Sequence, residues 1–248
     1  MNIRSYLMDE IIDEIRKADR ITALTGAGMS VESGIAPFRG EDGLWNEFDP
    51  QKMASISSFK KNPTKCWKLF KLQIEECLDS SPHKGHNSLV EMEELGLKSV
   101  ITQNIDGLHQ KAGNEEVLEL HGSLDRLICP SCYKEYKTSD FKDEIIQGNI
   151  PTCNCDEILK PDVVLFGERL PKDVLKKAWL EAERCDLILS LGTSAVVQPA
   201  ASIPTIAKEG GATVIEINLE ETPLTRRVTD HFIEGKIGDE LPKLLDRL

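Results

Sequence analysis

Short apolar segments rich in β-branched residues recur along the chain, and each ends abruptly in small or polar residues. Four segments show this pattern, at residues 21–24, 99–102, 187–191 and 213–217. Helix-like stretches lie between them, including 66–77, 87–95 and 173–182. Buried strands that alternate with helices predict an α/β fold in which helices cover both faces of a parallel sheet.

The polar residues that follow these strands form a second pattern. TGAGMS follows the first strand, QNIDG the second, GTS the third and NLE the fourth. In parallel sheets, ligands bind outside the carboxyl ends of the strands. We therefore expect the four polar segments to converge on one site.

Two stretches fall outside the alternation of strands and helices. Residues 40–82 contain turn signals and a helix but no clear strand, and residues 126–160 hold a cluster of cysteines. We interpret both as insertions that form a smaller lobe over the sheet edge, the first helical and the second metal-binding. The chain is then a single domain, 1–248, with a large lobe of roughly 1–39, 83–125 and 161–248.

The charge of the chain narrows the classes of partner. The net charge is −12, and the isoelectric point is near 5.0. Tight nonspecific binding of nucleic acid requires a basic surface, so we expect no direct nucleic-acid partner. A lysine-rich protein segment suits this charge, although the acidic residues are explained equally well by solubility.

The hydropathy pattern gives no sign of a membrane segment. The longest apolar runs are too short to span a bilayer. Acidic residues interrupt the amino-terminal stretch, MNIRSYLMDEIIDEIRKADR, which is typical of an amphipathic helix and not of a signal peptide. We therefore expect a cytoplasmic protein without a membrane partner. The oligomeric state is left open, a monomer included.

The seven cysteines fall into two groups. Cys66, Cys77 and Cys185 are scattered among helical patterns and are typical of buried packing residues. The clustered cysteines are Cys129, Cys132, Cys153 and Cys155. Two thiolate pairs separated by twenty residues suit a tetrahedral zinc ion with no open position, which is a structural site. The alternative is a redox or merely buried C-x-x-C, and the short C-x-C spacing of the second pair keeps it open.

A glycine-rich loop follows the first strand. Gly26 and Gly28 allow a tight turn and a close backbone approach to a pyrophosphate, although Val31 stands where a third glycine is usual. By itself this motif is also consistent with a simple turn. Phe38 and Arg39, in the glycine-punctuated stretch that follows, suit a lid over a flat, charged cofactor or, alternatively, a structural loop.

Together these motifs resemble the sirtuin family, in its prokaryotic type, over nearly the whole chain. GAGMSVESGIAPFRG is similar to the family's cofactor loop, TQNIDGLHQKAG to its nicotinamide and ribose motif, and LHG to its catalytic histidine motif. PDVVLFGE and GTSAVVQPA resemble its substrate-flanking segments, and EINLE its adenosine contact. The resemblance implies NAD-dependent removal of acyl groups from lysine, with a Rossmann lobe and a smaller zinc-bearing lobe.

The resemblance also implies roles for individual residues. The NAD contacts would be Gly26, Ala27, Gly28, Val31, Phe38, Arg39, Gln103, Asn104, Ile105, Asp106, His121, Gly192, Thr193, Ser194, Asn218 and Ile237. Val164 and Phe166 would line the acyl-lysine channel. The chain departs from the family at Ala36-Pro37, where Pro-Asp or Pro-Thr is usual. Because proline fixes φ and lacks a backbone donor, local cofactor contacts would differ there.

The resemblance assigns the chemistry to His121 and Asn104. A histidine with an ordinary pKa near 6.5 accepts a proton at neutral pH. In the implied mechanism, the acyl oxygen attacks the ribose carbon, nicotinamide leaves, and His121 deprotonates a ribose hydroxyl. The other four histidines, His83, His86, His109 and His231, have structural interpretations.

A helix of the small lobe bears on the choice of acyl group. Desuccinylases of this family carry a Tyr-x-x-Arg pair, and this chain has Phe70 and Gln73 at the matching positions. Residues three apart share a helix face, so both would line the acyl pocket. The loss of the positive charge predicts that acetyl-lysine or a longer neutral acyl-lysine is preferred to succinyl-lysine. Alternatively, this helix does not line the pocket, or Lys71 restores a charge if the alignment slips by one residue.

Three other functions compete with deacylation as interpretations of these motifs. A protein mono-ADP-ribosyltransferase would use the same site, but His121 and the substrate-flanking segments favour deacylation. A noncatalytic NAD-binding zinc scaffold would not need both QNID and the His-Gly motif. A dehydrogenase would have no use for a zinc ribbon between its Rossmann strands.

Overall fold

The computed structural model describes residues 3–40 and 43–248, with side chains from residue 7 onward in the first helix. Its main element is a six-stranded sheet in the order β3-β2-β1-β7-β8-β9, and every pairing within it is parallel. The strands are β1 (Ile21–Thr25), β2 (Leu97–Thr102), β3 (Val117–Glu119), β7 (Leu187–Leu191), β8 (Thr213–Asn218) and β9 (His231–Glu234). The predicted parallel sheet is confirmed.

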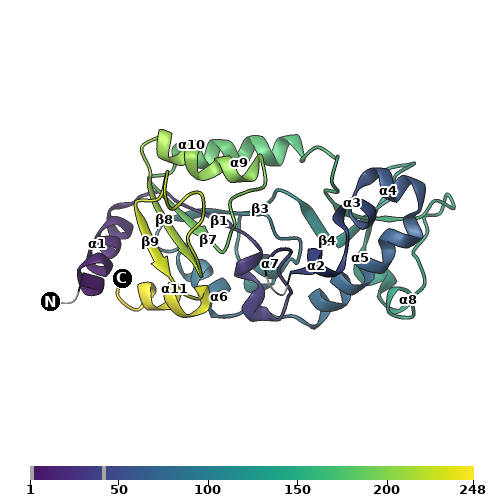
Figure 1. Cartoon of the computed structure of the whole chain (residues 1–248), viewed down its shortest axis with the longest axis horizontal. Coiled ribbons are helices and arrows are strands. Elements are labelled where there is room, and N and C mark those ends of the chain that lie inside the picture. Colours follow the sequence, from purple (N-terminus) through teal and green to yellow (C-terminus); the bar gives the residue numbers. More distant parts are fainter. Residues whose placement is uncertain (1–2, 41–42) are drawn as a thin grey trace.

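Helices cover both faces of this sheet, as predicted (Figure 1). One layer is α9 (Lys172–Arg184) with α10 (Ile203–Glu209), and the other is α1 (Ile3–Lys17), α6 (Lys84–Glu91) and α11 (Ile237–Leu245). Neighbouring residues of β1 face opposite layers: Ala23 packs with the α1, α6 and α11 residues, and Leu24 with those of α9 and α10. Each strand therefore needs apolar residues at consecutive positions, which explains the continuous apolar runs.

A second group of elements packs at one end of the sheet, around its own apolar core (Figure 1). Its helices are α2 (Leu44–Glu47), α3 (Pro50–Met53), α4 (Ile56–Lys61), α5 (Pro63–Asp79) and α8 (Lys142–Ile146). An antiparallel three-stranded sheet completes it, with β4 (Gly122–Ile128) between β5 (Glu135–Lys137) and β6 (Lys160–Val163). The remaining elements are α7 (Leu108–Ala112) and the 3-10 turns η1 (Ala27–Met29), η2 (Val31–Ser33), η3 (Thr138–Phe141) and η4 (Ala200–Ser202).

Local sequence explains where α5, the longest helix of this group, begins. The Asn62 side chain accepts a hydrogen bond from the Lys65 amide at 3.1 Å, and Pro63 occupies the first turn, where its missing N–H is not needed. Trp67 fixes the helix to the cysteine-bearing segment, because its indole N–H donates to the Leu159 carbonyl at 2.8 Å. Among the described residues, no helix is long and apolar enough to cross a membrane.

Candidate active site

The loops after β1 and β7 touch each other through their backbones. The Gly28 amide donates to the Gly192 carbonyl at 2.8 Å. A Cβ atom at Gly26 would lie 2.8 Å from the Gly192 carbonyl oxygen, and one at Gly28 would lie 2.8 Å from the Gly192 Cα. Because real Cβ atoms do not approach so closely, the contact requires glycine at each of these positions. The two glycine loops therefore form one backbone surface at the carboxyl ends of adjacent strands.

A buried polar network joins the loop after β1 to the loop after β2. The Asn104 side-chain amide donates to the Gly26 carbonyl and to the Ser30 hydroxyl, both at 3.0 Å. The Ser30 hydroxyl in turn donates to the Asp106 carboxylate at 2.7 Å. Burial raises the pKa of the Asp106 carboxyl, and the Ser30 hydrogen bond opposes that rise. Ser30 was not among the predicted site residues, yet it links two that were.

The third and fourth loops join the same network. The Gln103 side-chain amide donates to the Thr193 hydroxyl at 2.8 Å. The Asn218 side-chain amide donates to the Thr193 backbone carbonyl at 3.0 Å. The prediction that the four polar segments converge is thus confirmed by direct hydrogen bonds between them.

His121 lies between β3 and β4, with its imidazole directed at the loop after β2. Its Nδ1 is 2.9 Å from the backbone carbonyl oxygen of Gln103. A carbonyl only accepts, so Nδ1 carries the proton and Nε2 keeps its lone pair. Burial lowers the pKa of His121, and the Gln103 hydrogen bond partly offsets that effect. The ring is therefore neutral at pH 7 and presents a proton acceptor at Nε2.

A narrow cavity of about 30 Å³ lies beside this network. Its lining residues are Ala27, Ile35, Ala36, Phe38, Leu44, Gln73, Glu76, Cys77, Asn104, Ile105, Asp106 and Leu124. Phe38 stacks on Trp45 at 5.2 Å between ring centroids, and Trp45 meets the Phe166 ring edge to face at 6.1 Å. The three rings connect the glycine-rich loop to the segment predicted to bind substrate.

The residues predicted to face the acyl group lie in different surroundings. Phe166 is 38% exposed, whereas Phe70 is 1% exposed and packs against Trp67 in the core of the small group of elements. Gln73 lines the narrow cavity together with Glu76, one helical turn further on. Burial raises the pKa of the Glu76 carboxyl. Of the predicted pair, Gln73 alone is among the residues that line this cavity.

The other predicted contacts differ in their exposure. Val31, Arg39 and Ser194 are exposed. Val164 is half-buried, and its amide donates to the His121 carbonyl at 2.9 Å. Ile237 is buried at the start of α11.

Two buried histidines, His86 and His109, pack with the half-buried His83 behind the glycine-rich loop. The ring of His86 lies 4.5 Å from that of His83 and 4.9 Å from that of His109, centroid to centroid. The His83 Nε2 donates to the Met29 carbonyl at 2.6 Å, and its Nδ1 accepts from the Gly85 amide at 3.0 Å. Burial lowers the pKa of His86 to about 2 and that of His109 to about 4. This cluster was not predicted, because His109 of α7 is distant in the chain from His83 and His86 at the start of α6.

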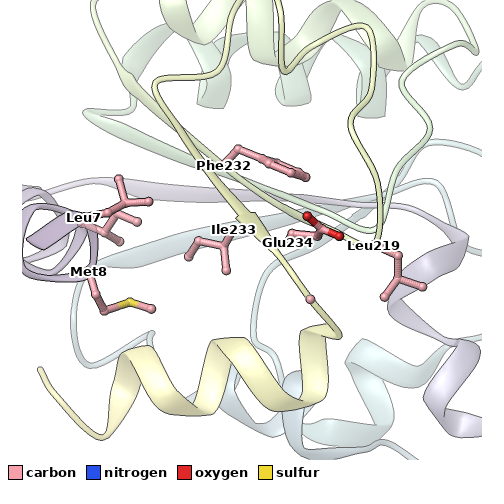
Figure 2. A pocket seen from close by; sticks show the side chains of 8 residues that line it. Leu7, Met8, Leu219, Phe232, Ile233 and Glu234 are labelled. Atoms are coloured by element: carbon pink, nitrogen blue, oxygen red, sulfur yellow. The ribbon is translucent and has the colours of Figure 1, made fainter. Parts of the chain in front are cut away.

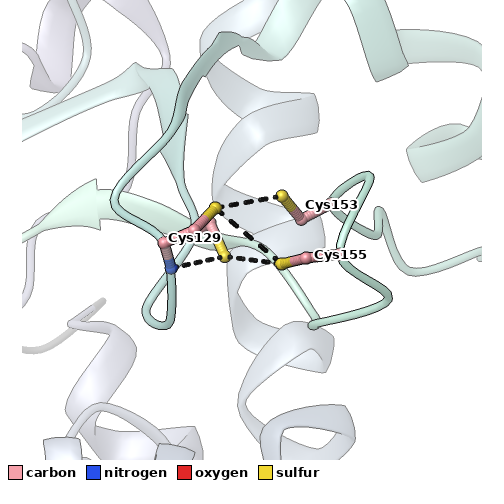
Figure 3. A group of neighbouring side chains, drawn as sticks. Cys129, Cys153 and Cys155 are labelled. Carbon is pink, nitrogen blue, oxygen red and sulfur yellow. Dashed lines mark hydrogen bonds between the residues drawn. The ribbon is translucent and has the colours of Figure 1, made fainter.

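The four clustered cysteines converge outside β4, as predicted (Figure 3). Their sulfur atoms lie within 4.8 Å of one another, with separations of 3.6 Å for Cys129–Cys155, 3.6 Å for Cys132–Cys153 and 3.8 Å for Cys132–Cys155. Zinc–sulfur bonds of about 2.3 Å in a tetrahedron place sulfurs about 3.8 Å apart, so these residues fit zinc. The short C-x-C pair therefore supplies two suitably placed thiols. Cys66, Cys77 and Cys185 are buried, as predicted.

A larger cavity of about 480 Å³ lies between α1 and β9, next to the carboxyl end of β8 (Figure 2). It is lined by Leu7, Met8, Ile11, Leu219, Phe232, Ile233, Glu234 and Gly235. Glu234 is the single ionisable side chain among these lining residues. A single carboxylate among apolar side chains does not supply the several catalytic groups that a second reaction site would need.

Comparison with known proteins gives consistent matches. The model of the Sir2 family matches residues 26–199. The chain is 47% identical over 246 residues to NAD-dependent protein deacylase 2 of Archaeoglobus fulgidus, covering 95% of this chain and 96% of the relative. It is 41% identical over 244 residues to the NAD-dependent protein deacetylase of Saccharolobus solfataricus, covering 98% and 97%.

Solved structures match the fold equally well. A complex of a Sir2 homolog with NAD has a TM-score of 0.87 at 42% identity, covering 96% of this chain and 93% of that one. A Sir2 structure with a deacetylated p53 peptide and 3'-O-acetyl ADP-ribose has a TM-score of 0.90 at 32% identity, covering 97% and 98%. Both likenesses extend over nearly the whole of each chain.

Proposed function

The chain belongs to the Sir2 family, and from that premise we propose that it is an NAD-dependent protein-lysine deacylase, chiefly a deacetylase, with His121 as general base. The reaction moves the acyl group from lysine to ADP-ribose and releases nicotinamide. The observation that carries the assignment of the base is the hydrogen bond from His121 Nδ1 to the Gln103 carbonyl. It leaves Nε2 free to accept a proton from a ribose hydroxyl.

The glycine loops provide the surface for the pyrophosphate of NAD. Gly26, Gly28 and Gly192 leave the backbone open to a phosphate, and free amides of such turns bind anions. Ala27, Val31, Phe38 and Arg39 surround the nicotinamide half from the same loop. Thr193, Ser194, Asn218 and Ile237 surround the adenosine half, and the bonds of Asn218 and Gln103 to Thr193 support this assignment.

Asn104 and Asp106 hold the reacting part of the cofactor. The Asn104 side chain is 3.0 Å from both Gly26 and Ser30, so it is fixed before any ligand arrives. Asp106 is held by Ser30 in the same way. Such prior fixing lowers the reorganisation needed in the transition state. Ile105 lies beside them, and we assign it a contact with the nicotinamide ring.

The acyl-lysine enters beside Val164 and Phe166. Gln73 lines the cavity with a neutral amide and Glu76 with a carboxyl group. Neither side chain carries a positive charge that would attract the carboxylate of a succinyl group. We therefore propose that neutral acyl groups are preferred to succinyl as substrates. Phe70 supports the wall from the core behind it.

Zinc has a structural role in this proposal. Four thiolates leave no open position, so Cys129, Cys132, Cys153 and Cys155 would hold the ion to fix the fold of β4 and β5. We assign a large lobe to about 1–39, 83–125 and 161–248, and a small lobe to about 40–82 and 126–160. Residues 1–2 and 41–42 of these ranges lie outside the described residues.

The partners follow from the reaction. They are acyl-lysine segments of other proteins, and lysine-rich segments, whose other lysines stay positively charged, suit a chain with a net charge of −12. We propose a cytoplasmic location. All seven cysteines are unpaired, which supports a reducing compartment.

The test is NAD-dependent loss of the acetyl group from an acetyl-lysine peptide, followed by mass spectrometry of the products. The wild type is expected to yield deacetylated peptide, nicotinamide and O-acetyl-ADP-ribose. His121→Ala is expected to lower the rate by about 10²- to 10⁴-fold, while His231→Ala, in the edge strand β9, leaves it unchanged. ADP-ribose attached to protein, without deacetylated peptide, would instead identify a mono-ADP-ribosyltransferase.

A further inference from the structure

Lys160 is an unusually buried cation at the start of β6. The residue is 7% exposed, and its ammonium group has two partners. It donates to the Val163 carbonyl at 2.7 Å and to the Glu168 carboxylate at 3.0 Å. Burial of a charged pair is costly, so its mere presence is weak evidence of a stabilising role. The positions of Val163 and Glu168 suggest a role other than stabilisation.

Glu168 closes a short loop around this pair. The oxygen that pairs with Lys160 also accepts from the Leu165 amide at 2.8 Å. The Glu168 amide donates to the Leu165 carbonyl at 2.9 Å. Together with the bond from Lys160 to Val163, these contacts tie residues 163, 165 and 168 into one fixed loop. Gly167, with φ of +89°, allows the chain to turn before Glu168.

The residues between these ties face the candidate active site. The Val164 amide donates to the His121 carbonyl at 2.9 Å. Phe166 is held on its other side, because its amide donates to Ala54 at 2.8 Å and its carbonyl accepts from Ile56 at 3.1 Å. The loop thus spans from the general base to the helices of the small lobe. A shift of the loop would move both of the side chains that flank the substrate.

We propose that Lys160 and Glu168 are positioning residues, which hold Val164 and Phe166 at the spacing that the acyl-lysine side chain requires. This inference rests on the proposed function. The pair acts through the loop and does not touch the reacting atoms. A misplacement of a substrate-holding group by about 1 Å can lower the rate about 100-fold.

The test compares the KM for an acetyl-lysine peptide with the KM for NAD. Lys160→Met keeps the length of the side chain but removes its charge, and the KM for the peptide is expected to rise at least about 10-fold. The KM for NAD is expected to stay within about two-fold, because the glycine loops do not contact this pair. Lys160→Arg retains a cation and is expected to restore most of the peptide affinity.

The matched control is Lys177→Met. Lys177 forms an exposed ion pair with Glu116 at 2.7 Å, outside the substrate-flanking loop, and its loss is expected to change neither KM. Glu168→Gln serves as a second variant should Lys160→Met fail to fold. It keeps an oxygen for the Leu165 amide, and it is expected to raise the KM for the peptide by a smaller factor.

Peptide binding without NAD, measured by fluorescence anisotropy, separates this inference from the proposed function. A wild type that binds the acetyl-lysine peptide but does not deacetylate it would refute the proposed reaction alone. The positioning role is overturned if folded Lys160→Met binds the peptide as tightly as the wild type does. An equal rise in both KM values would also overturn it, because general destabilisation moves both.

Discussion

Acid should destabilise this protein through its buried histidines. His86 and His109 are 0% and 1% exposed, and burial lowers their pKa values to about 2 and about 4. In the unfolded chain both have the ordinary value of 6.5. The unfolded state therefore binds more protons than the folded state below pH 6.5 or so. Stability from this source is fully present above that pH and is lost as the pH falls.

The size of the effect follows from the same values. Between pH 7 and pH 5, each unfolded imidazole gains a proton that the folded protein does not bind. The cost is about 2 kcal/mol per histidine, or about 4 kcal/mol for the pair. Domains are typically stable by about 5–15 kcal/mol, so the loss is a large fraction of the total. The buried Asp106 carboxyl, whose pKa is raised, acts in the opposite direction.

Because Asp106 opposes the effect, the informative quantity is the difference between variants. Urea denaturation at pH 7 and pH 5 gives the loss of unfolding free energy for the wild type and for His86→Gln. We expect the variant to lose about 2 kcal/mol less than the wild type. His231→Gln, in β9, is the control and should keep the wild-type loss. The same loss in the wild type and His86→Gln would refute the reasoning.

Three further predictions concern the reaction and the metal. Burial lowers the pKa of His121, so kcat/KM should be constant from pH 8 down to about 6.5 and should fall only below that pH. A midpoint of this fall above pH 7 would contradict a neutral buried base. Elemental analysis of the purified protein should find one zinc per chain. The Cys155→Ser variant should lose the zinc and unfold at a lower temperature, whereas the control Cys185→Ser should keep the zinc. In the same peptide, kcat/KM for acetyl-lysine should exceed kcat/KM for succinyl-lysine by about 10- to 100-fold. Gln73→Arg should reduce this ratio. A kcat/KM for succinyl-lysine at or above that for acetyl-lysine would count against the assignment of Gln73.

The parts of the fold that depend on local pattern were predictable. The apolar runs located β1, β2, β7 and β8, because a strand buried on both faces needs consecutive apolar residues. β3 was missed, since its three residues make too short a run to stand out. The predicted helix at 66–77 is the centre of α5, whose capping residues are Asn62 and Ser80. Capping residues lie outside the apolar pattern, so the pattern gave the helix but not its limits.

The candidate site also has some features that the sequence predicted and others that it did not. Gly26 and Gly192 were visible as glycines after strands, and the two cysteine pairs were visible as spacings. Trp45 meets Phe166, which is far away in the chain, and Lys160 meets Glu168 only because the intervening chain turns back; a tryptophan or a lysine carries no local signal of such a contact. The histidine cluster is hidden for the same reason. Side chains that act through long-range packing require the structure.

The bond from His121 to the Gln103 carbonyl has a consequence for how the enzyme tolerates genetic change. Where a carboxylate side chain orients a histidine, a single codon change removes the partner. Here the acceptor belongs to the main chain, so every amino acid at position 103 still offers it. Substitutions at this position are free to alter the link to Thr193 without changing which imidazole nitrogen carries the proton. The orientation of His121 therefore does not depend on the side chain at position 103, and that side chain can change together with the cofactor site.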